Sequence, residues 1–343
     1  MKRLIYMTNI AINGFGRIGR AAFKAILEKK LPFKIVAIND LTDTATLAHL
    51  LKYDSAYGRY DQSISYTTDS LVVAGEKYKV LAEKDPAQLP WRELEVDIVL
   101  ECTGRFRTQE LARLHLEAGA KKVILSAPAK SEGIKTIVLG VNQEKVKKTD
   151  RIISNASCTT NCLAPVTEIV RQNFGIKKAL MTTIHSYTAD QNLVDGPHKD
   201  LRRARAAAVN IVPTTTGAAI ATTKVIPSLT GDFDGMAVRV PTPVGSLVDA
   251  VYLTKKKVEE KKLNQAFKKA ARSARWRGIL TVSEEPLVSS DIVGNPASAI
   301  VDLALTKVMG DNFAKVVAWY DNEWGYANRL VELVEYVVGK RLL

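Results

Sequence analysis

The alternation of short apolar strands with helical patterns through residues 9–128 constrains the fold more than any other feature of this sequence. The strand segments read NIAIN, FKIVAIND, EVDIVLECTG and KKVILSAP, and helical patterns such as TDTATLAHLLK and QELARLHLEAG separate them. Strands that alternate with helices pair in parallel, which indicates a doubly wound sheet. From about Ala179 the pattern changes to the longer β-rich runs ALMTTIHSYT, GMAVRVPTPV and SLVDAVYLT, which are typical of a mixed or antiparallel sheet with helices on one face. The sequence therefore predicts an α/β chain in which a doubly wound parallel sheet is followed by an α+β domain.

A glycine-rich turn joins the first strand to the first helix. Gly14, Gly16 and Gly19 have the spacing GxGxxG, and Asp40 ends the next strand 21 residues after Gly19. Glycine lets the backbone approach a pyrophosphate closely, the helix N-terminus supplies free amide donors, and an acid at this distance bonds ribose hydroxyls. The pattern favours a Rossmann-type dinucleotide site. The alternative is a purely structural turn, with Asp40 as a helix cap.

Length and composition indicate a folded protein with two domains. The chain has 343 residues, and domains commonly have roughly 100–200. Apolar residues make up 46% and charged residues 25%, as in globular proteins. No run of about 18 apolar residues occurs, and Thr8 and Asn9 interrupt the apolar start, so we expect a cytoplasmic protein with neither a signal peptide nor a membrane partner. Residues 1–6 precede the start suggested by MTNIAINGFGRIGR and are either an extension or a misassigned start.

Cysteine and histidine are scarce. The 3 cysteines, an odd number, argue against a disulfide framework and for a reducing compartment. The 4 histidines form no HExxH pattern and no CxxC pair accompanies them, so we expect no metal site. The formal charge of +13 favours anionic partners in general, nucleic acid and phosphorylated metabolites included. In the most basic segment, residues 255–275, Val258, Leu263 and Phe267 have helical spacing, which predicts an amphipathic helix with a solvated basic face.

The segment SNASCTTNC, residues 154–162, places Cys158 and Cys162 four residues apart. Such a pair could form a disulfide, half of a metal site, buried filler, or a nucleophile with a bystander. The scarcity of cysteine and histidine weakens the first two interpretations. Five polar neighbours make a poor apolar pocket, which favours a nucleophile at Cys158. Cys162, one helical turn later, is expected to be structural, and Cys102 is expected to lie in the core.

Eight segments, in order along the chain, resemble those of phosphorylating glyceraldehyde-3-phosphate dehydrogenases: INGFGRIGR, LLKYDS, SNASCTTNCLAP, HSYTADQ, DLRRARAAA, TTTGAA, GMAVRVPTP and WYDNEWGY. The resemblance covers essentially the whole chain from Met7. It implies NAD as the cofactor, glyceraldehyde 3-phosphate and inorganic phosphate as substrates, and a homotetramer that works in glycolysis, gluconeogenesis or both. It also implies a dinucleotide-binding domain of residues 1–157 and 322–343, to which the C-terminal helix returns, and a catalytic domain of residues 158–321.

Aldehyde oxidation explains why such an enzyme needs a reactive cysteine. A carbonyl carbon releases hydride only after a nucleophile has made it tetrahedral, and a thiolate does this and leaves a thioester. Cys158 is expected near a helix N-terminus, which lowers the pKa of a thiol. The resemblance assigns the second catalytic role to His185, at the end of the strand ALMTTIH. A cationic imidazole there would lower the Cys158 pKa further. The resemblance also implies that His185 takes the proton of the hemithioacetal.

Phosphorolysis of a thioester requires two phosphates to be held together. Guanidinium groups pair bidentately with phosphate, and hydroxyls satisfy the remaining acceptors. By resemblance, Thr188 and Arg239 hold the substrate's phosphate, with Arg203 nearby. The attacking phosphate is received by Ser157, Thr159, Thr216 and Gly217. Each arginine could instead be a surface or subunit-contact residue, and DLRRARAAA offers three candidates for the role given to Arg203.

The resemblance extends to cofactor contacts. It assigns Arg17 and Ile18 to the pyrophosphate and adenosine region, Thr103 and Ser126 to the cofactor groove, and Asn322 and Tyr326 to the nicotinamide. Asp40 favours NAD over NADP, because a 2′-phosphate would meet its carboxylate with no adjacent arginine. Leu41 and Pro197 favour NAD as well, because they resemble the residues of NAD-preferring members of the family. The chain departs from the family pattern at Cys102, where serine is common, and in PTPVGSLVDA, which lacks an asparagine often found after PTP.

Two other functions fit parts of the sequence. An erythrose-4-phosphate dehydrogenase shares the cysteine motif and the fold, but TTTGAA, the segment for the incoming phosphate, favours the phosphorylating enzyme. The basic charge also permits a nucleic-acid-binding side role. No arginine-rich tail or aromatic-basic interleaving occurs, so no dedicated nucleic-acid partner is expected.

Overall fold

The computed structural model describes residues 7–343, so the prediction made for residues 1–6 lies outside the described residues. The chain divides into two compact units. The first comprises the described residues up to Ile137 with Glu144–Ala156 and Ala327–Leu343, and the second comprises Val138–Gln143 and Ser157–Tyr326. The domain boundaries expected from the sequence, 1–157 with 322–343 and 158–321, stay a prediction.

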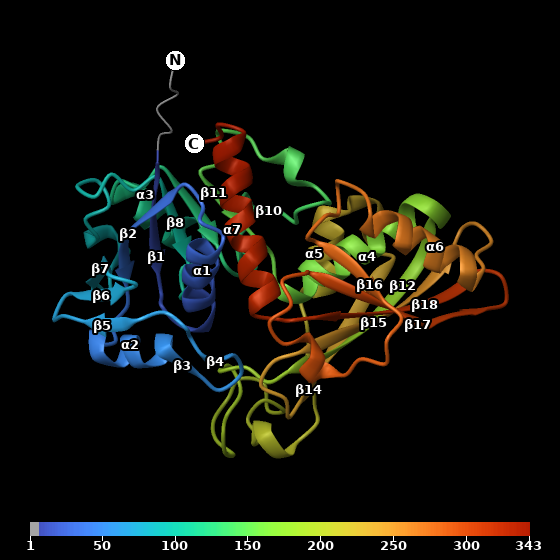
Figure 1. Ribbon diagram of the computed structural model, residues 1–343. Coiled ribbons are helices and arrows are strands. Elements are labelled where there is room, and N and C mark those ends of the chain that lie inside the picture. Colours follow the sequence, from blue (N-terminus) through green and yellow to red (C-terminus); the bar gives the residue numbers. More distant parts are fainter. Residues whose placement is uncertain (1–6) are drawn as a thin grey trace. The chain divides into compact units, whose positions relative to one another are not determined.

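The first unit is built on a nine-stranded sheet with the order β10-β11-β9-β8-β1-β2-β7-β6-β5 (Figure 1). Neighbouring strands are parallel from β10 to β7, whereas β6 pairs antiparallel with both β7 and β5. The chain moves from β1 to β2 on one side and later occupies β8 and β9 on the other, so the strand order reverses between β1 and β8. Ligands of open α/β sheets bind at the carboxyl ends of the strands beside such a reversal.

The elements of the first unit have the following bounds. Its strands are β1 Thr8–Asn13, β2 Phe33–Asn39, β3 Tyr53–Asp54, β4 Gly58–Arg59, β5 Ile64–Tyr66, β6 Ser70–Val73, β7 Glu76–Leu81, β8 Ile98–Glu101, β9 Lys122–Leu125, β10 Lys135–Thr136 and β11 Ile152–Ser154. Its helices are α1 Arg17–Glu28, α2 Thr44–Lys52 and α3 Gln109–Glu117, and most of α7, Trp324–Gly339, belongs to it as well.

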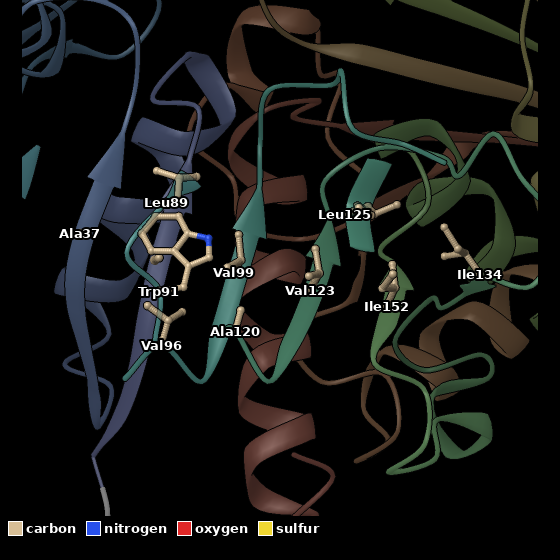
Figure 2. Close-up of a cluster of buried hydrophobic side chains, with 12 residues drawn as sticks. Ala37, Leu89, Trp91, Val96, Val99, Ala120, Val123, Leu125, Ile134 and Ile152 are labelled. Atoms are coloured by element: carbon tan, nitrogen blue, oxygen red, sulfur yellow. The ribbon is translucent and has the colours of Figure 1, made fainter. Parts of the chain in front are cut away.

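A buried hydrophobic cluster supports this sheet (Figure 2). Ala37 of β2, Val99 of β8, Val123 of β9 and Ile152 of β11 contribute side chains from neighbouring strands, and Trp91 is fully buried beside them. Strands β8 and β9 are buried along their whole length, as expected for parallel strands covered on both faces. The cluster therefore holds in place the strands whose carboxyl ends form the site described below.

The second unit contains a seven-stranded sheet with the order β13-β14-β12-β15-β18-β17-β16. The pairs β12–β14 and β16–β17 are parallel and the other pairs are antiparallel, so the sheet is mixed. Helices α4, α5 and α6 pack together against it (Figure 1). The bounds are α4 Cys158–Phe174, β12 Ile176–Ser186, β13 Val212–Thr215, α5 Ala218–Val225, β14 Phe233–Val240, β15 Ser246–Thr254, α6 Glu260–Ala271, β16 Leu280–Ser283, β17 Ala299–Met309 and β18 Phe313–Tyr320.

The predicted fold class is confirmed: a Rossmann-type doubly wound parallel sheet is combined with an α+β unit that has a mixed sheet. The basic amphipathic helix is α6, with Leu263 and Phe267 buried. Val258 is also buried but precedes the helix, because α6 begins only at Glu260.

Candidate active site

A cavity of about 320 Å³ lies in the first unit where β1, β2 and β8 end. Its lining consists of Asn13, Gly14, Gly16, Asn39, Asp40, Leu41, Glu83, Lys84, Cys102, Thr103, Arg105 and Phe106. Four residues predicted to contact a dinucleotide, Gly14, Gly16, Asp40 and Thr103, are thus brought together beside the reversal of strand order.

The three glycines of the turn play different parts. Gly14 has φ +92°, and a Cβ there would lie 2.7 Å from the Thr103 nitrogen. A Cβ on Gly19 would lie 2.1 Å from the Gly14 carbonyl oxygen, so the helix can approach the turn only with glycine here. A Cβ on Gly16 would meet nothing within 4 Å, which leaves room above the turn for a ligand. This cradle fits the pyrophosphate of a dinucleotide.

The Asp40 carboxylate holds the glycine turn and can still accept further hydrogen bonds. Its Oδ2 accepts a hydrogen bond from the Phe15 amide at 2.7 Å, and its Oδ1 accepts one from the Thr42 amide at 3.0 Å. Asp43, not Asp40, caps α2, so the helix-cap interpretation of Asp40 is wrong. A carboxylate has about four acceptor sites, so Asp40 can still bond ribose hydroxyls.

Three other residues assigned to the cofactor do not line this cavity. The Arg17 guanidinium pairs bidentately with Asp54, at 2.8 and 3.2 Å, and lies over the Tyr57 ring. Ile18 and Ser126 are half-buried outside the lining. Their assignment to the cofactor stays a prediction.

Asn322 and Tyr326 belong to the second unit, and both are buried. The Asn322 Oδ1 accepts hydrogen bonds from the Gly245 amide at 3.1 Å and from the Ser246 hydroxyl at 2.9 Å. These two donors fix the orientation of the Asn322 amide, because only its oxygen can face them.

Cys158 and His185 approach each other in the second unit. Cys158 is the first residue of α4, whose N-cap is Ser157, and His185 lies at the end of β12. The distance from Cys158 Sγ to His185 Nε2 is 3.4 Å. The Tyr320 ring and the imidazole pack in a T-shaped arrangement, with 5.9 Å between centroids. The expected nucleophile and base therefore form a pair at a helix N-terminus.

The second imidazole nitrogen has two competing neighbours. His185 Nδ1 lies 2.7 Å from the Ser186 carbonyl oxygen and 2.6 Å from a terminal guanidinium nitrogen of Arg239, which is opposite His185 in the β12–β14 register. A proton on Nδ1 would bond Ser186 and leave a lone pair on Nε2 facing the thiol. A bare Nδ1 would accept from Arg239 and place the proton on Nε2. The two contacts favour opposite tautomers.

The protonation states differ from those expected from sequence. Burial raises the pKa of the Cys158 thiol, although the Arg239 charge and hydrogen bonds at the helix N-terminus oppose this. Burial, with the Arg239 charge, lowers the pKa of His185 to about 3. The prediction of a lowered Cys158 pKa beside a cationic imidazole is therefore wrong: desolvation outweighs the helix N-terminus, and an arginine 2.6 Å away disfavours imidazolium. A neutral thiol faces a neutral imidazole.

The hydroxyls predicted to receive the attacking phosphate already have protein partners. Ser157 Oγ accepts from the Thr160 amide at 3.1 Å, and the Thr159 hydroxyl lies 2.9 Å from the Tyr320 hydroxyl. Thr216 Oγ1 accepts from the Ala218 amide at 3.2 Å, while Gly217, which has open space at its Cα, precedes α5. Thr188, which was assigned to the substrate phosphate instead, is half-buried just beyond the end of β12. These four hydroxyls and Gly217 come from the ends of α4, α5 and β12.

The two arginines assigned to the substrate phosphate differ. Arg203 pairs with Asp190 and, at 3.5 Å, with Asp200, so it serves first to fix the loop between β12 and β13. Arg239 forms no ion pair within residues 7–343, and its buried Nε has no hydrogen-bond partner there. Arg239 is thus the better anion ligand of the two.

The other two cysteines were predicted to be buried. Cys162 is completely buried, as expected. The prediction for Cys102 is wrong: it follows the last residue of β8, is partly exposed and lines the cavity. Desolvation still raises the pKa of its thiol to about 12, so it remains protonated.

Sequence reasoning missed two polar residues of the second unit. The Tyr320 hydroxyl links Thr159 to Thr183, at 2.9 Å from each hydroxyl, and Ser246 orients Asn322. Tyr320 ends the apolar strand FAKVVAWY, and a polar ring at a strand end was the available signal. Ser246 gave no comparable signal.

Within residues 7–343, no helix has the length and apolar character needed to cross a bilayer. The same residues contain no group of three or more His, Cys, Asp or Glu side chains placed to hold a metal ion.

Comparison with known proteins places these sites in a family. Residues 8–109 match the family model described as glyceraldehyde 3-phosphate dehydrogenase, NAD binding domain, and residues 157–322 match that of the C-terminal domain. The chain is 55% identical over 329 residues to a glyceraldehyde-3-phosphate dehydrogenase of Streptomyces coelicolor, covering 96% of this chain and 98% of that protein. Identity to the enzyme of that name from Geobacillus stearothermophilus is 55% over 334 residues, and to that from Mycobacterium avium 56% over 339, each covering 97% of this chain and 99% of the relative. With the cysteine–histidine pair and the glycine cradle in place, these matches show that the chain belongs to the glyceraldehyde-3-phosphate dehydrogenase family.

Proposed function

We propose that this protein is an NAD-dependent phosphorylating glyceraldehyde-3-phosphate dehydrogenase, which converts D-glyceraldehyde 3-phosphate and inorganic phosphate into 1,3-bisphosphoglycerate in glycolysis or gluconeogenesis. The 3.4 Å contact between Cys158 Sγ and His185 Nε2, beside Arg239, carries this proposal. A thiol, a base and a guanidinium that has no ion-pair partner among residues 7–343 are the groups that thioester chemistry on a phosphorylated aldehyde requires.

In the first step, the Cys158 sulfur bonds to the aldehyde carbon. The thiol proton passes through His185 Nε2 to the carbonyl oxygen, which gives a neutral hemithioacetal. This route needs the tautomer in which Nδ1 donates to the Ser186 carbonyl, 2.7 Å away, because Nε2 must then carry the lone pair. Partial charges at the start of α4 favour the developing negative charge on sulfur.

Oxidation and phosphorolysis follow. NAD, held by the glycine cradle, would supply the acceptor for the hydride of the hemithioacetal carbon. His185 takes the hydroxyl proton as that carbon–hydrogen bond breaks, so that a thioester remains on Cys158. The phosphate oxygen then attacks the thioester carbon, the carbon–sulfur bond breaks, and the phosphate proton returns to sulfur. The proton on His185 leaves to solvent, so one proton is released per turnover.

Roles for the binding residues complete the proposal. Arg239 and Thr188, with Arg203 nearby, hold the substrate phosphate, while Ser157, Thr159, Thr216 and Gly217 receive the attacking phosphate. The cradle of Gly14, Gly16 and Gly19 binds pyrophosphate, Asp40 bonds the ribose, and Arg17, Ile18, Thr103, Ser126, Asn322 and Tyr326 complete the cofactor contacts. The lack of any ion pair at Arg239 within residues 7–343 supports its role most directly.

We also propose a cytoplasmic homotetramer without a dedicated nucleic-acid partner. The loop between β12 and β13 exposes Leu193, Leu201 and Val209, each at 78% or more. Three apolar side chains this exposed on one loop support a contact with another subunit. Sedimentation of the purified protein tests the assembly.

The decisive assay follows NAD reduction with glyceraldehyde 3-phosphate, with and without inorganic phosphate. Multiple turnovers only with phosphate, and a single burst without it, are expected. Faster and phosphate-independent turnover of erythrose 4-phosphate would contradict the proposal. The segment TTTGAA, which contains Thr216 and Gly217, favours the phosphorylating reaction over that alternative.

A further inference from the structure

Three polar residues end neighbouring parallel strands beneath the cavity. Asn13, Asn39 and Glu101 are the last residues of β1, β2 and β8, and the sheet register pairs Asn13 with each of the other two. Glu101 is only 1% exposed and His115, on α3, is completely buried. A buried carboxylate is costly unless donors surround it, so its partners decide what it does.

Glu101 has four hydrogen-bond donors. Its Oε2 accepts from Asn13 Nδ2 at 2.6 Å and from His115 Nε2 at 3.0 Å. Its Oε1 accepts from the Thr103 amide at 2.8 Å and from the Thr103 hydroxyl. Four donors occupy the acceptor sites of both oxygens, so the Glu101 side chain acts only as an acceptor.

The tautomer of His115 follows from Trp91. The indole nitrogen of Trp91, seen in Figure 2, lies 3.0 Å from His115 Nδ1 and can only donate. His115 Nδ1 must therefore accept, and the ring proton sits on Nε2, where it points at Glu101. The core cluster thus sets the direction of the hydrogen bonds that reach the cavity.

At the other end of this hydrogen-bond network, Asn13 and Asn39 also bond to protein partners. Asn13 Oδ1 accepts from Asn39 Nδ2 at 2.7 Å, and Asn39 exchanges hydrogen bonds of 2.8 Å with the backbone of Glu83. Asn13, Asn39, Glu83 and Thr103 all line the cavity, whereas Glu101 lies behind them. The Gly14 turn packs on Thr103, because a Cβ on Gly14 would lie 2.7 Å from the Thr103 nitrogen.

We infer that Glu101 and His115 are positioning residues for the dinucleotide, which fix Thr103, Asn13 and Asn39 as the floor of the cofactor cavity. This inference rests on the proposed function, in which the cavity holds NAD. Neither residue lines the cavity. Glu101 and His115 raise the affinity for the dinucleotide, because they hold the Thr103 amide and the neighbouring side chains in place before the dinucleotide binds.

Glu101→Gln is the sharpest test, because glutamine has the same shape. An amide has one accepting and one donating end, so in either orientation its NH₂ group meets donors, those of Thr103 or those of Asn13 and His115. We expect the dissociation constant for NAD, measured by calorimetry, to rise at least about tenfold, or about 1.4 kcal/mol, with kcat at saturating NAD within about threefold. Val99→Ala, in the same strand, lowers core stability without touching the network and should leave this constant within about twofold.

A second pair of variants protects the test against misfolding of Glu101→Gln. His115→Gln can place an amide N–H where Nε2–H was, whereas His115→Leu cannot, so only the leucine variant should lose NAD affinity. The inference is overturned if the two His115 variants bind NAD with equal affinity. It is also overturned if a folded Glu101→Gln protein has an unchanged dissociation constant for NAD. Both outcomes count only when the unaltered protein itself binds NAD. An equal loss of NAD affinity in Val99→Ala and Glu101→Gln proteins of equal melting temperature would also overturn the inference. Failure of the unaltered protein to bind NAD would overturn the proposed function as well.

Discussion

The floor of the cofactor cavity and the cysteine–histidine site differ in how completely their polar groups are hydrogen-bonded. Around Glu101, in the first unit, four donors saturate one carboxylate and a core indole fixes the tautomer of His115. At His185, in the second unit, one ring nitrogen lies between an acceptor and a cation, and the buried Nε of the neighbouring Arg239 has no hydrogen-bond partner within residues 7–343. A binding surface works best when its groups are fixed, whereas a catalytic group must exchange protons and meet new charges. Incomplete pairing marks the region where chemistry takes place.

The largest effect should come from Cys158→Ser. A serine hydroxyl is far less acidic than a thiol, so kcat should fall at least about 10⁴-fold while NAD binding by the first unit is unchanged. Stopped-flow measurement of NAD reduction, with calorimetry for binding, checks both parts. Cys162→Ser is the matched control and should keep most activity, because Cys162 is fully buried and lies outside the pair with His185. Similar losses in the two variants would mean that the nucleophile has been misassigned.

His185→Asn should lower kcat by roughly 10²–10⁴-fold, the usual contribution of a general acid–base group. Because His185 is neutral in the folded protein, the pH at which Cys158 becomes alkylated should change little in this variant. Iodoacetamide alkylation followed across pH measures this. A clear upward shift would restore the thiolate–imidazolium pair that the sequence suggested.

The same variant should alter acid stability. The folded pKa of His185 is about 3 and its ordinary value is 6.5, so between these values the unfolded chain binds a proton that folded His185 does not. Stability from this group is present above about pH 6.5 and is lost as pH falls toward 3. His185→Asn removes the titration, so its melting temperature should fall less steeply between pH 6.5 and 4. Parallel melting curves against pH would contradict the buried neutral imidazole.

Local patterns in the sequence predicted the fold and the cofactor half of the site. The spacing of Gly14, Gly16 and Gly19 after a strand fixes a turn within a few residues, so its geometry follows from covalent constraints. His185 lies 27 residues from Cys158, and only the family resemblance joined them before the structure did. The Asn13–Glu101 contact spans 88 residues and depends on strand register, which no local pattern encodes.

Charge states and competing partners were the hardest to predict. The depressed pKa expected for Cys158 followed from a helix N-terminus, but the opposing desolvation depends on everything packed around the thiol. Arg203 was assigned to phosphate without sight of Asp190 and Asp200, which pair with it. The prediction for the Cys158 pKa is wrong, whereas the assignment of Arg203 stays a prediction. Both depend on surroundings that only the folded chain sets.

Arg239→Gln should have the third largest effect. Loss of the guanidinium in contact with His185 should lower kcat/KM for glyceraldehyde 3-phosphate by roughly 10²-fold or more, mostly through KM, because charge-assisted bonds to phosphate are strong. The Arg239 charge also lowers the Cys158 pKa, so the alkylation pH of Cys158 should rise. Arg239→Lys keeps the charge and should preserve the alkylation profile while still weakening substrate binding. An unchanged KM in both variants would exclude Arg239 from the phosphate site.

The smallest effect concerns the choice of cofactor at Asp40, and it tests how rigid the first unit's site is. The Asp40 carboxylate would repel a 2′-phosphate, so the unaltered protein should favour NAD over NADP by at least about tenfold in kcat/KM, or about 1.4 kcal/mol. Lys84 and Arg105 line the same cavity and attract phosphate, which keeps this preference moderate.

Asp40→Ala should narrow the gap between NAD and NADP by improving NADP use. It also removes the acceptor for the Phe15 and Thr42 amides and so should weaken NAD binding. Asp40→Asn is the matched control, because its oxygen can still accept from one of these amides without the charge. If charge decides the preference, both variants gain NADP activity and only the alanine variant loosens the turn. Equal use of NAD and NADP by the unaltered protein would show instead that Lys84 and Arg105 outweigh Asp40.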